Sequence, residues 1–223
     1  NTTPVQTTQS ISGLVPASYT VSVADGHGCT ASASTTITEP AVLRSSITHT
    51  NVSCYGGSDA TATVTPTGGN SPYTYRWNSS PVQTTANANS LNAGPYNVMV
   101  TDSKGCTYQD TVTIGQPTAL VVTPSTVKNI SCYGRTDGSI VITASGGTSP
   151  YNYLWTTISP LNFTATATNL AVGTYPVKVS DAKGCNLTIS VPITQPAQLT
   201  SSATSTDVTC FGANNGTASV TAN

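Results

Sequence analysis

The sequence carries few charged side chains. It has 7 Lys and Arg and 8 Asp and Glu among 223 residues, so that only 7% of the chain is charged, whereas about a quarter is usual in soluble domains. So few cations cannot form the basic surface that neutralises phosphates, which excludes a nucleic-acid-binding function. Disorder of the usual kind needs high net charge and few β-branched residues. It is excluded because the net charge is -1 and Thr, Val and Ile are abundant.

Long apolar runs are absent as well. No run approaches the roughly 20 residues that cross a bilayer, and the chain does not open on a charged stretch followed by an apolar one. We therefore expect no membrane insertion in this segment, and we expect any export signal to lie outside it.

The side chains that usually perform catalysis or bind metals are scarce. Glu39 is the single Glu, the two His residues, His27 and His49, do not recur, and there is no Cys-x-x-Cys pair. An enzyme needs a nucleophile with a base, or paired carboxylates, and a zinc site needs clustered Cys and His. We therefore expect the protein not to be an enzyme and to use no cofactor or metal.

The chain does contain an internal repeat. Segments 50–56, 128–134 and 206–212 begin 78 residues apart and share a Cys followed by an aromatic residue and Gly. We call their cysteines the front cysteines: Cys54, Cys132 and Cys210. A second recurring motif, Asp-x-x-Gly-Cys, ends in the back cysteines: Cys29, Cys106 and Cys185. Self-similarity at a fixed period indicates an array of repeated structural units.

Prolines mark the limits of the repeats. Pro40, Pro117 and Pro196 each follow the last predicted strand of a unit. We therefore place complete repeats at residues 41–117 and 118–196, the C-terminal part of a repeat at 1–40, and the N-terminal part of a following repeat at 197–223. Because the outer pieces are incomplete, we expect the chain to be a stretch of a longer array.

Within a repeat, apolar and polar residues alternate, which is the period of a half-buried β-strand. Residues 185–193 show this most clearly, because every second residue from Cys185 to Ile193 is apolar. About six or seven short strands fit in each repeat, and no helical period occurs. The sequence therefore predicts an all-β fold of tandem β-sandwich repeats of about 78 residues, joined by short connections into a rod.

Aromatic residues favour an immunoglobulin-like form of this sandwich. We expect Trp77 and Trp155, which end strands with alternating Tyr, to fill the core. The alternative is an aromatic platform, formed by Trp77 and the two Tyr before it, on which carbohydrate stacks. Tyr96 and Tyr175 open the penultimate strand of each repeat and resemble the tyrosine corner, in which the hydroxyl binds nearby backbone.

Three acidic residues recur with the back cysteines. Asp25, Asp102 and Asp181 each begin an Asp-x-x-Gly turn. We expect these carboxylates to cap backbone N–H groups in turns whose Gly takes a positive φ. Calcium ligation is the alternative.

Periodicity reduces the pairing of the cysteines to three schemes. The first pairs cysteines within a repeat, Cys54 with Cys106 and Cys132 with Cys185, and leaves Cys29 and Cys210 to partners outside the segment. The second pairs sequence neighbours. The third pairs a front cysteine with the back cysteine of the next repeat, as in Cys54 with Cys185. Strand parity favours the first, because it points both sulfurs inward. Standard immunoglobulin topology favours the third, because it places the two cysteines of a domain at opposite ends. Disulfides of any scheme indicate an oxidising, extracellular setting.

The order of the motifs resembles the SprB repeat family. The motifs are Cys-Tyr-Gly at residues 54 and 132, Gly-Gly-x-Ser-Pro-Tyr-x-Tyr-x-Trp at 68 and 146, Leu-x-x-Gly-x-Tyr at 91 and 170, and Asp-x-x-Gly-Cys. The similarity covers essentially the whole chain. One departure is Ala60, where the other units have Gly138 and Gly216, and we expect it to alter only a local turn.

The resemblance implies secretion by the type IX route, display on the outer surface of a gliding Bacteroidota cell, and a role in adhesion or gliding. We therefore expect a structural shaft segment of a cell-surface adhesin filament, with further repeats of the same chain as its partners. Because few Lys residues protect the edge strands, lateral association with copies of the filament is a further expectation. The alternatives are a polysaccharide-binding repeat module and spacer domains of a secreted enzyme.

Overall fold

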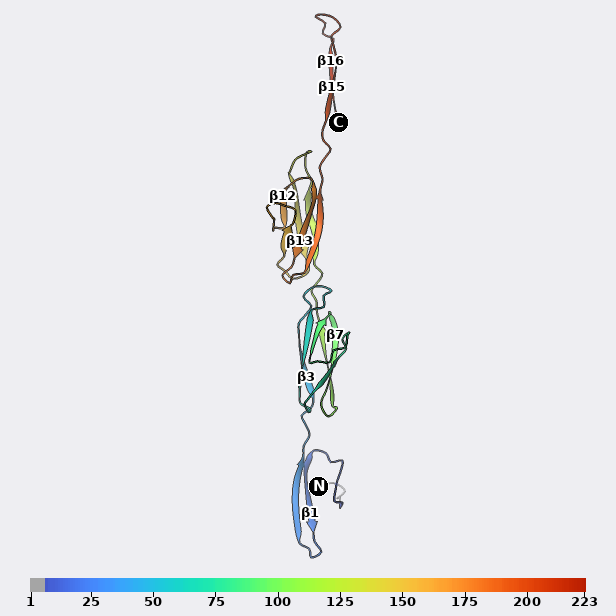
Figure 1. The fold of residues 1–223 in the computed structure, drawn as a ribbon, viewed down its shortest axis with the longest axis vertical. Helices are drawn as coiled ribbons and strands as arrows, with labels where there is room; N and C mark the ends of the chain where they lie inside the picture. Colours follow the sequence, from blue (N-terminus) through green and yellow to red (C-terminus); the bar gives the residue numbers. More distant parts are fainter. Residues whose placement is uncertain (1–6) are drawn as a thin grey trace. The chain divides into compact units, whose positions relative to one another are not determined.

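A computed structural model describes residues 7–223, which form sixteen β-strands and no helix (Figure 1). The strand pairs whose register is defined are all antiparallel. The all-β prediction is therefore confirmed. Within residues 7–223 there is accordingly no helix with the length and apolar character needed to cross a membrane.

The repeat at 41–117 contains two three-stranded sheets. One has the order β3-β4-β6, with bounds Arg44–His49, Ala60–Thr67 and Asn87–Leu91. The other has the order β5-β7-β8, with bounds Thr74–Trp77, Gly94–Thr101 and Thr107–Ile114.

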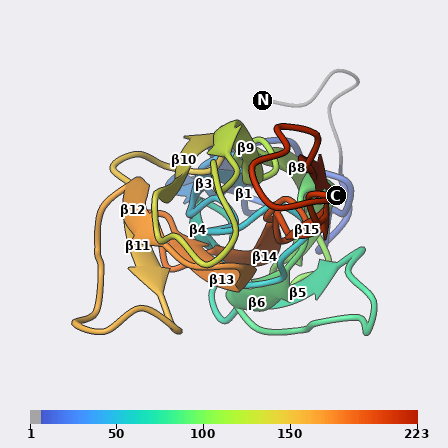
Figure 2. The same ribbon diagram turned by 90° about the horizontal axis from the view of Figure 1, so that it is seen from above.

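The repeat at 118–196 has the same pair of sheets. One has the order β12-β10-β9, with bounds Thr166–Leu170, Gly138–Ser145 and Val121–Lys128, and the other has the order β11-β13-β14, with bounds Asn152–Trp155, Gly173–Ser180 and Asn186–Ile193. Figure 2 shows β9 and β10 on one side of this repeat and β13 and β14 on the other.

The strand order is that of an immunoglobulin-like sandwich. Strands β9, β10 and β12 correspond to A, B and E of a constant-type domain, and β11, β13 and β14 correspond to C, F and G. Trp155 ends the C-like strand with none of its surface exposed, which is the place of the buried Trp in such domains. The immunoglobulin-like prediction is therefore confirmed.

The flanking segments form two-stranded ladders. Strand β1 (Ala17–Ala24) pairs with β2 (Thr30–Ile37), and β15 (Ser201–Thr206) pairs with β16 (Thr217–Ala222). The three prolines at positions 40, 117 and 196 lie outside strands. The chain divides into two compact units. The first runs to Thr50 and from Thr61 to Ile114, and the second comprises Asn51–Ala60 and Gly115–Asn223.

The core of the 118–196 repeat follows from the alternation of residues along its strands. Strand β10 buries every second residue at its start, Gly138, Ile140 and Ile142, and β13 buries Val177 and Val179. Side chains from both sheets form one apolar cluster with Trp155. Because only one face of each sheet is buried, Thr and Ser occupy much of the opposite face and take the place of charge at the surface.

The sequence suggested that Ala60 alters a turn, but Ala60 lies in a strand. It is the first residue of β4 and is fully buried, and Gly138 is the first residue of β10. A Cβ at Gly138 would lie 2.9 Å from the carbonyl oxygen of Leu170. The Ala-to-Gly difference therefore falls in a strand, and at Gly138 the neighbouring backbone leaves no room for a methyl group.

We expect Ile140→Ala to lower the free energy of unfolding of the 118–196 repeat by about 2–5 kcal/mol, because it removes a fully buried side chain of β10 and leaves a cavity. Urea unfolding followed by fluorescence checks this in a Trp77→Phe background, where Trp155 is the only tryptophan. The control is Val127→Ala on β9, a side chain that is 40% exposed. Equal losses in the two variants would contradict the assigned core.

Candidate functional site

The back cysteine Cys185 follows a tight turn that Asp181 organises. The Asp181 Oδ1 atom accepts hydrogen bonds from the backbone N–H groups of Lys183 and Cys185, both at 2.9 Å. The Gly184 N–H donates to the Asp181 carbonyl oxygen at 3.1 Å, and Gly184 has a φ of 86°. A positive φ at this position favours Gly. The turn therefore fixes the position of Cys185, immediately before β14.

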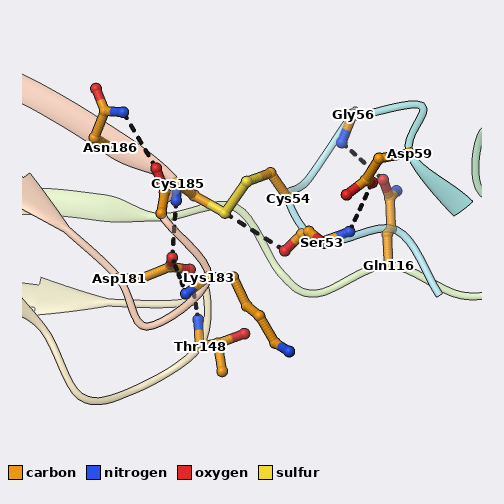
Figure 3. The surroundings of a disulfide bond; sticks show 11 residues. Ser53, Cys54, Gly56, Asp59, Gln116, Thr148, Asp181, Lys183, Cys185 and Asn186 are labelled. Atoms are coloured by element: carbon orange, nitrogen blue, oxygen red, sulfur yellow. Dashed lines mark hydrogen bonds between the residues drawn. A yellow bond between two sulfur atoms is a disulfide. The ribbon is translucent and has the colours of Figure 1, made fainter. Parts of the chain in front are cut away.

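The second oxygen of the same carboxylate holds a neighbouring loop. The Thr148 N–H donates to Asp181 Oδ2 at 2.8 Å (Figure 3), and the Ala182 N–H donates to the Thr148 carbonyl oxygen at 2.8 Å. A Cβ on Gly147 would lie 2.6 Å from Asp181 Oδ2. The second Gly of the Gly-Gly pair is therefore needed for the carboxylate to approach this loop.

The surroundings of Asp181 stabilise its ionised form. Its burial, at 3% exposure, raises the pKa. The backbone N–H groups of Thr148, Lys183 and Cys185 lower the pKa, and their combined effect exceeds that of burial, so the pKa lies below its ordinary value.

The same turn precedes the other two back cysteines. Asp102 Oδ1 accepts from the N–H groups of Lys104 and Cys106, and Asp25 Oδ1 accepts from those of His27 and Cys29, all at 2.9 Å. The Asn70 N–H, which binds Asp102 Oδ2 at 2.9 Å, is the largest cause of the lowered pKa of Asp102. These carboxylates thus cap backbone groups, and no cluster of three or more metal-binding side chains occurs in residues 7–223.

The front cysteine Cys54 lies in a loop, residues 51–57, that is tied to the segment after β8. The Val52 N–H donates to the Gly115 carbonyl oxygen at 3.0 Å, and the Gly115 N–H donates to Asn51 Oδ1 at 2.9 Å. The Gly56 N–H donates to Gln116 Oε1 at 2.8 Å (Figure 3). The front loop therefore lies beside the end of β8.

Hydrogen bonds within the loop complete its shape. Asp59 Oδ1 accepts from the Ser53 N–H at 2.9 Å, and the Cys54 carbonyl oxygen accepts from the Gly57 N–H at 3.0 Å. The hydrogen bonds to Ser53 are the leading cause of the lowered pKa of Asp59. The backbone around Cys54 is thus fixed on both sides of the cysteine.

The loop of Cys132 has the same bonds with equivalent partners. The Ile130 N–H donates to the Thr194 carbonyl oxygen at 3.0 Å, and the Gly134 N–H donates to Gln195 Oε1 at 3.0 Å. Asp137 Oδ1 accepts from the Ser131 N–H at 3.1 Å. The two front loops therefore have one conformation, although their cysteines differ in bonding state.

Cys54 forms a disulfide with Cys185 (Figure 3). The two Cα atoms lie 5.6 Å apart, in the usual range for a disulfide, and the Ser53 carbonyl oxygen lies 3.4 Å from the Cys185 sulfur. The other four cysteines are exposed free thiols: Cys29, Cys106, Cys132 and Cys210. The favoured pairing of Cys54 with Cys106 and of Cys132 with Cys185 is therefore wrong, and the structure has the third scheme.

The length of β14 explains why Cys132 does not bond to Cys185 of the same repeat. The Cys132 loop is bonded to Thr194 and Gln195, just after β14, whereas Cys185 lies just before β14. Eight extended residues span about 27 Å, and a disulfide requires Cα atoms within about 7 Å. Parity assigns a residue to one face of a sheet, but it carries no information about position along the strand axis.

The disulfide closes a long loop. Its cysteines are 131 residues apart, and on the chain-entropy model a loop of this size stabilises the folded state by about 5 kcal/mol. Such a contribution is large for repeats with small cores.

The aromatic side chains predicted to lie in the core are arranged as follows. Trp77 and Trp155 are fully buried, and their Nε1–H groups donate to the carbonyl oxygens of Thr85 and Thr164. Tyr96 and Tyr175 are half-buried. The Tyr175 hydroxyl donates to the Ala171 carbonyl oxygen at 2.9 Å, four residues upstream, as does Tyr19 to Val15. This is the tyrosine-corner bond.

The aromatic row at Tyr73, Tyr75 and Trp77 is not an open platform. Trp77 is buried, Tyr73 and Tyr75 are half-buried, and the Tyr73 hydroxyl donates to the Gly68 carbonyl oxygen at 2.6 Å. Tyr151 forms the equivalent bond to Gly146 at 2.7 Å. The row therefore fixes the Gly-Gly loop and leaves no strip of exposed rings.

Several polar residues that lie in the front loops or bond to them were not singled out from the sequence. They are the Asn, Asp and Gln side chains that accept backbone N–H groups: Asn51, Asn129, Asp59, Asp137, Gln116 and Gln195. Their recurrence at equivalent places in the two complete repeats was the available signal.

The comparison with protein families agrees with the repeat pattern. The SprB repeat family model matches residues 46–82, 125–160 and 202–223, and each match contains one front cysteine. No curated protein matches the chain. Among solved structures, three N-terminal domains of the Highly Immunogenic Outer Capsid protein (Hoc) of bacteriophage RB49 are similar. They have 17% sequence identity and a TM-score of 0.45, with 82% of this chain and 69% of that chain covered.

We expect the 118–196 repeat to lose stability in acid through Asp181. Because the folded state lowers the pKa of this carboxyl, its contribution to the free energy of unfolding is complete above the ordinary Asp pKa of about 3.9. The contribution is lost as the pH falls through the lower pKa of the folded state. Asp181→Asn should unfold at lower urea concentration at pH 7 and should show a shallower decline below about pH 4.

Urea midpoints between pH 3 and 7, read from Trp155 fluorescence in the Trp77→Phe background, measure this effect. The control is Asp207→Asn, which changes an exposed carboxylate outside the repeat. If Asp181→Asn and Asp207→Asn have the same pH profile, the carboxylate does not hold the turn.

Proposed function

We propose that this chain is a shaft segment of a long secreted adhesin filament. Three stretches of it match the SprB repeat model, which supports a repeat region of the cell-surface adhesin type. The filament supports adhesion or gliding, and secretion follows the type IX route that the family resemblance implies. The SprB repeat is a structural repeat rather than an enzyme family, so the role proposed for this segment is mechanical.

The observation that carries the proposal is the disulfide between Cys54 and Cys185. It joins the front loop of one repeat to the back turn of the next repeat, and the two cysteines are 131 positions apart in the sequence. Tension applied to the ends of the chain passes through the sulfur atoms and bypasses residues 55–184. Such a bond suits a segment that has to hold its length under load.

Two further features support a shaft over a binding module. The aromatic row of Tyr73, Tyr75 and Trp77, the candidate platform for sugars, is buried or half-buried in the sandwich. The Asp side chains that recur from repeat to repeat accept backbone N–H groups and thereby hold turns. These recurring carboxylates thus stabilise the repeat itself.

We expect the disulfide to limit the extension of the chain under force. When the 223-residue chain is pulled from its ends, the bypassed 130 residues stay out of the tension path. The oxidised chain should therefore stop about 450 Å short of the length reached after reduction, at about 3.5 Å per residue.

Single-molecule force spectroscopy measures this difference. Cys54→Ser should extend to the full length without reductant, and the control Cys132→Ser, which alters an exposed free thiol, should behave as the unaltered chain. Full extension of the oxidised chain would contradict a role of this bond in bearing tension. Retention of the oxidised chain on surface polysaccharide would instead place the repeats among binding modules.

A further inference from the structure

Every front cysteine and every back cysteine of the chain is presented in the same local structure. All three back cysteines follow a turn whose Asp carboxylate accepts the cysteine N–H at 2.9 Å. All three front cysteines have a carbonyl oxygen that accepts an N–H from three residues downstream, at 3.0 to 3.1 Å. The backbone around each of the four free thiols therefore has the same hydrogen bonds as the backbone around the corresponding bonded cysteine.

The loops do not depend on the disulfide for their shape. Asp59 and Asp137 accept the N–H of the residue before the front cysteine at 2.9 and 3.1 Å, and Asn215 does so before Cys210 at 3.1 Å. Cys54 is bonded and Cys132 and Cys210 are not. Each free front cysteine is thus already held in the conformation that Cys54 has in the disulfide.

Sequence order explains why only one pair has formed. The bonded pair joins the front cysteine of the 41–117 repeat to the back cysteine of the 118–196 repeat. Cys132 would need the back cysteine of a repeat after residue 196, and Cys106 would need the front cysteine of a repeat before residue 41. Neither of these cysteines is present in the sequence. By the same rule, Cys29 would need the front cysteine of an earlier repeat, and Cys210 would need the back cysteine of a later one.

We propose that Cys29, Cys106, Cys132 and Cys210 are further members of a disulfide ladder. In this ladder each front cysteine bonds to the back cysteine of the next repeat of the same polypeptide. Where a complete repeat follows residue 196, Cys132 bonds to the back cysteine of that repeat. Where a repeat with a front loop precedes residue 41, Cys106 bonds to the front cysteine of that repeat. Because each bond skips from one repeat into the next, successive bonds overlap in sequence.

The chemistry is thiol–disulfide exchange in an oxidising compartment. The two thiols lose two protons and two electrons as the sulfur–sulfur bond forms. A protein or low-molecular-weight disulfide accepts the electrons and protons and leaves as two thiols.

The test duplicates residues 118–196 directly after Pro196. The copy carries Thr188→Ser, an exposed position, so that its Cys185 peptide differs in mass from the original. The extended chain gains two cysteines. We expect it to gain no free thiol: four thiols react with iodoacetamide before reduction in the original chain, and four should react in the extended one.

Peptide mapping without reduction then identifies the new bond. We expect Cys132 of the original repeat to be joined to the marked Cys185 of the copy within one polypeptide. Cys54 should still be joined to the unmarked Cys185. In the control, Cys132→Ser is made only in the original repeat and not in the copy. The bond to the marked Cys185 should then be absent, and the number of free thiols should rise by one, at the marked peptide. The ladder is overturned if Cys132 stays free, bonds to the unmarked Cys185, or bonds to a cysteine of a second chain.

Discussion

The position of Cys185, and with it the disulfide to Cys54, depends on one carboxylate that accepts three backbone N–H groups. Asp181 uses one oxygen for the turn that ends at Cys185 and the other for the loop after Gly147. These loops belong to different strand connections, so a single side chain sets their separation. With the turn fixed, the back cysteine stands at a defined place for the front cysteine of the preceding repeat. The disulfide is therefore a consequence of the turn, and the same turn recurs at Asp25 and Asp102.

The low charge of the chain explains why backbone capping carries so much of the polar structure. The described residues contain one salt bridge, between Lys128 and Asp137 at 3.8 Å, and its Lys is largely exposed, so its contribution is small. Loops are instead held by Asp, Asn and Gln side chains that accept main-chain N–H groups. These bonds need no cation as partner, and hydroxyl groups on the outer faces of the strands supply the solvation. A small core, many caps and a long-range disulfide together replace charge pairing as the means of stabilising each repeat.

Much of the fold could be predicted from the sequence, because it rests on local patterns. The period of two located the strands, the Asp-x-x-Gly motif located the turns, and the order of the aromatic residues indicated an immunoglobulin-like sandwich. The disulfide could not be predicted by parity, since parity assigns a face and the pairing depends on the end of the strand at which Cys185 lies. Leu187 shows the same limit, because it shares the inward face yet is 39% exposed near the start of β14. The Ala60 position shows another limit. The sequence predicts a local turn there, whereas at the equivalent Gly138 the constraint comes from the carbonyl oxygen of Leu170 on a neighbouring strand.

The closed loop between Cys54 and Cys185 also bears on proteolysis. A protease that cuts one peptide bond between these cysteines opens the loop, yet the two parts of the chain stay joined through the sulfur atoms. The exposed segment around Phe163, at 64% exposure, is a natural place for such a cut. A nick there leaves the outer segments connected, so damage to one sandwich does not separate the repeats on either side of it. Outside a cell, where proteases are common and no chain can be resynthesised in place, a covalent bypass of this kind preserves the continuity of the chain.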